Sequence, residues 1–149
     1  MNVATATATT GEFGPLTKRV MQFSHMIEDR ATGEGGPIDW APFSELVATD
    51  EFVRVGAYME VMNWKEYTDF LSEWAGATRF ETTVFRIIEV GQIVIKEIEE
   101  RHHKGDEFIK KNVISVFEFD DAQMIRHLDI YEQARDSGQW IIEAATRSH

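Results

Sequence analysis

The sequence predicts a single α+β domain, in which helices packed against one face of a curved antiparallel sheet come mostly first along the chain. Three observations predict it: apolar side chains recur at helical spacing before residue 75, β-rich runs with short breaks follow residue 79, and no internal repeat interrupts this order. The domain is expected to span residues 13–149. Residues 1–12, which alternate Ala and Thr without a hydrophobic period, are expected to be a disordered leader.

Two helices are predicted near the amino terminus. The first begins at Pro15, a residue suited to a first helical turn, and its apolar positions are spaced by four, three and four. They are Leu16, Val20, Phe23 and Ile27. A Gly-rich stretch, residues 32–37, ends it. A short second helix capped by Asp39 is expected over Trp40–Val47.

A strand over Glu51–Glu60 and a third helix are expected next. Asn63 and Glu66 have the spacing of a capping box, and Gly76 is the expected stop. Four hairpin-linked strands and a closing helix around Trp140 then complete the prediction. The four strands are Phe80–Glu89, Ile93–His103, Glu107–Phe119 and Met124–Glu132.

Composition excludes several classes of function. A formal net charge of −11 argues against nucleic-acid binding, and the absence of cysteine excludes disulfides and thiolate chemistry. No apolar run has the length of a membrane span, and no secretory signal pattern is present, so a cytoplasmic protein is expected. The glycines of residues 33–36 lack the lysine of a phosphate loop. We expect no cofactor.

The last predicted strand carries the most informative residues. Residues two apart on a strand share a face, so His127, Asp129 and Tyr131 point one way while Leu128 and Ile130 point the other. If the first face lines a pocket, apolar surroundings favour the protonated carboxyl group that a general acid needs. If it faces water, the strand is simply half exposed. Shifting the strand by one residue would move every side chain to the other face, and so would exchange the two interpretations.

The second strand of the four adds further candidates. Glu97 and Glu99 share a face and could share a proton with a neighbouring carboxylate, although the same residues fit a solvated charged surface. The adjacent His102 and His103 point to opposite faces, so no metal site is expected there. Aromatic residues predicted to bind a substrate are Tyr131, Tyr58, Trp64, Phe70 and Trp74.

The order of the predicted elements resembles that of the nuclear transport factor 2-like superfamily, and especially of its SnoaL-like cyclases and limonene epoxide hydrolases. Residues 113–119 and 125–131 resemble the last hairpin of that superfamily. The resemblance implies a cone-shaped fold over about residues 16–133. It also implies that the last strand presents an acid–base aspartate into the cone, here Asp129. The Arg-x-Asp pair of the epoxide hydrolases has no equivalent in residues 95–101; Glu97-x-Glu99 or Glu99-x-Arg101 could replace it.

Three functions are compatible with these residues. The first is a cofactor-independent enzyme that opens, cyclises or isomerises a hydrophobic oxygenated small molecule, such as a polyketide, terpenoid or steroid-like compound. Asp129 would be the acid–base group, assisted by His127, Glu97 or Glu99. The second is a protein that binds such a ligand without chemistry. The third is a dimer module, because apolar residues occupy both faces of two predicted strands; a homodimer is expected in each case.

Overall fold

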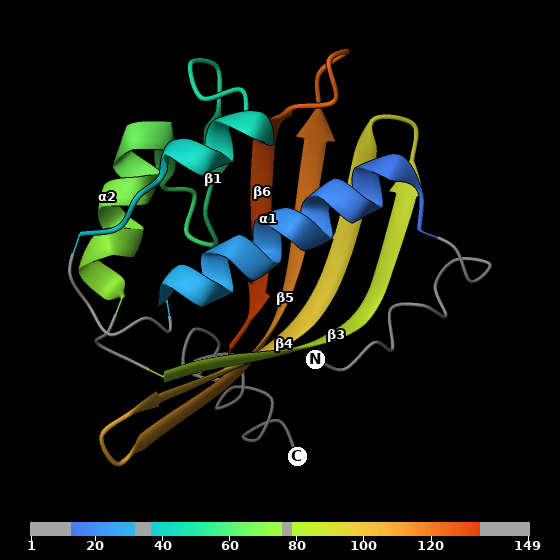
Figure 1. The fold of residues 1–149 in the computed structure, drawn as a ribbon. Coiled ribbons are helices and arrows are strands. Elements are labelled where there is room, and N and C mark those ends of the chain that lie inside the picture. Colours follow the sequence, from blue (N-terminus) through green and yellow to red (C-terminus); the bar gives the residue numbers. More distant parts are fainter. Residues whose placement is uncertain (1–12, 32–36, 76–78, 135–149) are drawn as a thin grey trace.

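The computed structural model describes residues 13–31, 37–75 and 79–134, and shows two helices on one face of a strongly curved sheet (Figure 1). The α+β class is therefore confirmed. Helix α1 crosses the hollow face of the sheet, and α2 lies beside it (Figure 1). The helical elements are α1 (Pro15–Ala31), the short 3₁₀ helix η2 (Ala41–Glu45) and α2 (Trp64–Trp74).

The six-stranded sheet has the order β2-β1-β6-β5-β4-β3. Its strands are β1 (Val53–Val55), β2 (Val61–Asn63), β3 (Arg79–Val90), β4 (Ile93–Lys104), β5 (Glu107–Phe119) and β6 (Ile125–Gln133). The last four pair as consecutive antiparallel hairpins, as predicted. Strand β1 pairs in parallel with β6, so the sheet is mixed rather than purely antiparallel.

Helix α1 is attached to β3 by hydrogen bonds near both of its ends. Thr17 donates to the Glu89 carboxylate from its backbone N–H at 2.7 Å and from its hydroxyl at 2.8 Å. Eleven residues further along α1, the Glu28 carboxylate accepts a 2.7 Å hydrogen bond from Thr82. Backbone donors at a helix start need such acceptors. These two contacts hold α1 against the sheet, so that one face of the helix points toward the strands.

The main core fills the space between the helices and the concave face of the sheet. Phe23 of α1 packs edge-to-face against Phe43, at 5.7 Å between ring centroids, and against Phe117 of β5, at 5.8 Å. All three rings are buried. Aromatic pairs of this geometry add to the free energy gained by burying their surface. The 3₁₀ helix thereby closes one end of the core.

The local predictions have mixed outcomes. The capping box is confirmed: Asn63 accepts from the Glu66 backbone N–H, and the Glu66 carboxylate accepts from that of Asn63. The single strand predicted over residues 51–60 is wrong, because only Val53–Val55 is a strand there: a turn at Gly56–Glu60 ends β1, and β2 begins at Val61, after the predicted range. The expected leader over residues 1–12, the breaks at residues 32–36 and Gly76, and the closing helix around Trp140 lie outside the described residues.

None of the described helices combines the length and the apolar character needed to cross a membrane.

Candidate functional site

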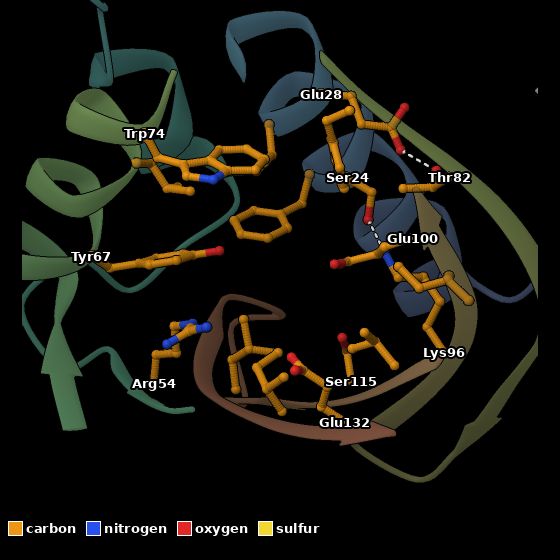
Figure 2. A pocket seen from close by; sticks show the side chains of 18 of the residues that line it. Ser24, Glu28, Arg54, Tyr67, Trp74, Thr82, Lys96, Glu100, Ser115 and Glu132 are labelled. Atoms are coloured by element: carbon orange, nitrogen blue, oxygen red, sulfur yellow. Dashed lines mark hydrogen bonds between the residues drawn. The ribbon is translucent and has the colours of Figure 1, made fainter. Parts of the chain in front are cut away.

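A cavity of about 220 Å³ opens between the concave face of the sheet and the two helices. Its lining side chains come from α1, α2 and the five strands β1, β3, β4, β5 and β6, and Figure 2 shows them converging on it. Aromatic rings form much of its wall: Phe23, Tyr67, Phe70, Trp74, Phe80 and Phe117. The cavity thus combines apolar walls with ionisable side chains, as ligand sites commonly do.

Strand alternation decides which residues reach the cavity. On β6 the lining residues are Leu128, Ile130 and Glu132. On β4 every second side chain lines it, namely Lys96, Ile98, Glu100 and His102. Because successive side chains point to opposite faces, the residues between them lie on the convex face.

The expectation that Asp129 faces the cavity is corrected by this alternation. Asp129 and His127 lie on the convex face, where their side chains are each 33% exposed and form a 2.9 Å hydrogen bond to one another. Tyr131 is 60% exposed on the same face. The physical reason is the pairing of β6, which turns the more apolar set, Leu128 and Ile130, inward.

Glu97 and Glu99 also lie on the convex face, away from the cavity. Glu97 forms an ion pair with Arg86 of β3 at 2.7 Å, and Glu99 forms one with Arg101 at 2.9 Å. They therefore belong to the charged face that was the alternative interpretation, although with 25% and 21% of their side chains exposed they are partly buried there. The structure does not bring them together with the residues of the cavity.

The expected aromatic residues divide into three groups. Phe70 and Trp74 of α2 line the cavity. Trp64 packs instead among the core rings, 5.3 Å from Phe52. Tyr58 is 70% exposed in the turn between β1 and β2. The part of the wall that α2 contributes therefore begins at Tyr67 and does not include its first residue, Trp64.

Two acid–base pairs face the cavity. The Glu100 carboxylate lies 3.0 Å from His102 Nε2, with only 19% and 13% of the two side chains exposed. His102 is held between Trp74 and Phe80, at centroid distances of 5.4 and 5.0 Å. On the neighbouring strands, the Lys111 ammonium group lies 3.1 Å from Glu132. Both pairs are partly removed from water, which strengthens their mutual attraction.

Tyr67 and Arg54 form the opposite side of the cavity (Figure 2). The Arg54 guanidinium carbon lies 5.0 Å from the centre of the Tyr67 ring. Burial raises the pKa of the Tyr67 hydroxyl, an effect that Arg54 opposes. Arg54 Nε is buried and has no hydrogen-bond partner within the described part of the chain. Such an unsatisfied donor is suited to an oxygen atom of a bound molecule.

Lys96 occupies the other side of the cavity, near Ser24 of α1 (Figure 2). Its Nζ donates a 2.6 Å hydrogen bond to the Ser24 hydroxyl. Burial lowers the pKa of Lys96 from 10.5 to about 8, and the carboxylates of Glu28 and Glu100 oppose that shift. A lysine with this pKa exchanges protons near neutral pH, unlike an exposed one.

Comparison of the fold with solved structures finds close similarity at low sequence identity. An LEH-like epoxide hydrolase of M. tuberculosis superposes with a TM-score of 0.60 and 20% identity, over 79% of this chain and 82% of that one. IdmH, a candidate polyketide cyclase from Streptomyces antibioticus, gives 0.64 at 9% identity, over 80% and 93%. A candidate ketosteroid isomerase from Kribbella flavida gives 0.60 at 15% identity, over 79% and 77%.

The chain has a nuclear transport factor 2-like fold. An NTF2-like protein of unknown function from Cytophaga hutchinsonii covers 86% of this chain and 97% of that one, with a TM-score of 0.56 and 14% identity. No protein-family model matches the sequence, and no curated protein does either. The fold predicted from the last hairpin is thus confirmed.

Sequence reasoning missed the ionisable residues that line the cavity, above all Lys96, Glu100, Arg54 and Glu132. One signal was present on β6, where Leu128 and Ile130 form the more apolar set and so the natural inward face. On β4 no such signal exists, because Ile93 and Ile95 alternate with Val94 and Ile98. There, only the three-dimensional structure selects Glu100 over Glu99.

Proposed function

We propose that this protein is a cofactor-independent enzyme that acts by general acid–base catalysis on a hydrophobic oxygenated small molecule bound in the cavity. The observation that carries the proposal is the Glu100–His102 pair, 3.0 Å apart and largely buried on the cavity wall. The similarity to structures described as an epoxide hydrolase, a polyketide cyclase and a ketosteroid isomerase supports an enzyme on this fold.

Glu100 has the position of the group that takes up and returns the proton. Its side chain lines the cavity from β4, and Tyr67 and Lys96 lie on opposite sides of the same space (Figure 2). His102 donates to the carboxylate and keeps it in place. A carboxylate so held can remove a proton from a carbon next to a carbonyl group or from an attacking water.

Tyr67 and Arg54 would bind the substrate oxygen on which negative charge develops. The Tyr67 hydroxyl points into the cavity (Figure 2), and the nearby guanidinium group favours an anionic oxygen there. Donors that are fixed before the reaction stabilise the transition state without reorganisation. Ring opening, cyclisation and isomerisation all combine a proton transfer with a charged oxygen, so the same residues serve each of them.

The test is a screen of lactones, epoxides and polyketide-like ketones with wild-type protein and Glu100→Gln. Glutamine keeps the shape of the side chain but cannot exchange the proton, so kcat/KM should fall by about 10²-fold or more. Glu118→Gln is the matched control, because Glu118 is on β5 in an exposed 2.8 Å ion pair with Arg126. Undiminished turnover by Glu100→Gln would overturn the proposal.

Ligand binding without chemistry is the second candidate function. The observation that favours it is the number of aromatic rings in the wall, which provide binding area but no proton transfer. In that case isothermal titration would detect saturable binding of a compound that chromatography recovers unchanged after long incubation.

A further inference from the structure

Lys96 is a buried amine that the proposed acid–base chemistry does not use. The residue is 8% exposed, and it lines the cavity from β4. Nζ is held by the 2.6 Å hydrogen bond to Ser24 and lies 5.7 Å from the centre of the Phe117 ring. None of the ion pairs within 4.0 Å in the described ranges includes Lys96. A buried cation without an ion-pair partner is costly to keep charged, although the ring face offsets part of that cost.

The surroundings of Lys96 favour its neutral, nucleophilic form. With a pKa of about 8, about a quarter of the molecules carry a neutral amine at pH 7.5, against about one in a thousand for an ordinary lysine with a pKa of 10.5. The charged groups that face it are Glu28 of α1 and Glu100 of its own strand, and both favour the protonated form. Desolvation exceeds their combined effect. The neutral amine is the form that attacks carbonyl carbons.

We propose that Lys96 forms a Schiff base with small aromatic aldehydes and ketones that enter the cavity. This inference concerns the same cavity as the proposed function but a different residue and a covalent step. The aromatic walls select a flat, apolar carbonyl compound. An apolar cavity of about 150 Å³ accommodates benzene, so about 220 Å³ accommodates a substituted benzene that carries a carbonyl group.

The step balances without any co-reactant. The Lys96 nitrogen lone pair attacks the carbonyl carbon, a C–N bond forms, and the π electrons of the C=O bond pass to oxygen. Proton transfers give a neutral carbinolamine. The hydroxyl group then leaves as water, so the two hydrogens of the amine depart with the former carbonyl oxygen and a C=N bond remains. No oxidant or reductant takes part.

The experiment uses benzaldehyde as the probe and sodium cyanoborohydride to fix any imine as a benzylamine. Wild-type protein is treated at pH 7.5, and the modified lysines are identified by mass spectrometry of peptides produced by cleavage after glutamate. Lys65 is the internal control, because it is exposed on α2, paired with Asp69 at 2.6 Å, and that pairing raises its pKa. Benzyl alcohol, which fits the same space but forms no imine, is the competitor.

The proposal predicts that Lys96 is modified at least about tenfold faster than Lys65. Excess benzyl alcohol should slow modification at Lys96 but not at Lys65, and Lys96→Arg should show only the background of surface modification. Modification of Lys96 no faster than that of Lys65, or with no protection by benzyl alcohol, overturns the proposal. The readout needs no turnover, so a negative result leaves the Glu100 test intact, and full activity of Glu100→Gln leaves this one intact.

Discussion

At the scale of single residues, the direction in which a side chain points determines whether it lines the cavity. Asp129 and Glu132 are both carboxylates on β6, but only Glu132 lines the cavity. The sequence correctly indicates two faces for this strand. It cannot choose between them by chemistry alone, because a buried carboxylate and an exposed one look the same in a pattern of alternating residues. The choice comes from the pairing of β6 with β5 and β1, which places Leu128 against the core.

Lys96 gives a residue-scale prediction about pH and stability. Its pKa is lower in the folded state, about 8, than the ordinary 10.5, so between these values the unfolded chain binds more protons. Stability contributed by this residue therefore rises with pH across that window, by at most about 3 kcal/mol. Lys96→Met removes the titration. The stability of Lys96→Met minus that of wild type should therefore be greatest below pH 8, and this difference should decrease steadily up to pH 10.5.

Urea denaturation of both proteins at several pH values between 7 and 10.5 measures this difference. Taking the difference cancels the titration of every group that the two proteins share. A difference that stays constant over the whole range would show that Lys96 is not desolvated in the folded protein.

At the scale of elements, local signals predict helix starts and the hairpin pairings of β3 to β6, but not the pairing of strands distant in the sequence. Asn63 marks the start of α2 because its side chain satisfies a backbone donor, a contact that involves neighbouring residues alone. The parallel pairing of β1 with β6 joins residues more than seventy positions apart, and no local signal encodes it. Gly56 is a residue typical of turns, but the Phe- and Val-rich residues on either side of it predict one continuous strand.

The capping box of α2 gives an element-scale prediction. Asn63→Ala leaves the Glu66 backbone N–H without its acceptor and should reduce the free energy of unfolding by about 1 kcal/mol. Because α2 carries Tyr67 and Trp74 into the cavity wall, ligand affinity should fall as well. Urea denaturation measures the first effect. The control is Glu73→Ala on the exposed side of the same helix, which should stay within about 0.5 kcal/mol of wild type.

At the scale of the whole molecule, the two faces of the sheet differ in what covers them. The concave face is filled by the helices, the core and the cavity. The convex face leaves apolar side chains partly exposed on β3, β5 and β6, namely Phe85, Ile88, Ile114 and Tyr131. Apolar residues on both faces of the strands are visible in the sequence, and exposed apolar side chains gathered on one face of a sheet are typical of an interface between subunits.

We therefore expect a homodimer that buries the convex face. Light scattering at micromolar concentration should give twice the mass of the 17.1 kDa chain. Ile114→Lys, which places a charge on that face opposite Tyr131, should shift the protein toward the monomer without changing its circular dichroism. A monomeric wild-type protein would contradict this expectation.

The central claim is that the concave cavity, and not the Asp129 face, performs the chemistry. The most direct measurement compares kcat/KM of Glu100→Gln and Asp129→Asn on the best substrate from the screen, with circular dichroism to confirm folding. The structure predicts a loss of about 10²-fold or more for Glu100→Gln and a change of only a few-fold for Asp129→Asn. A large loss for Asp129→Asn with full activity in Glu100→Gln would contradict the assignment of the site.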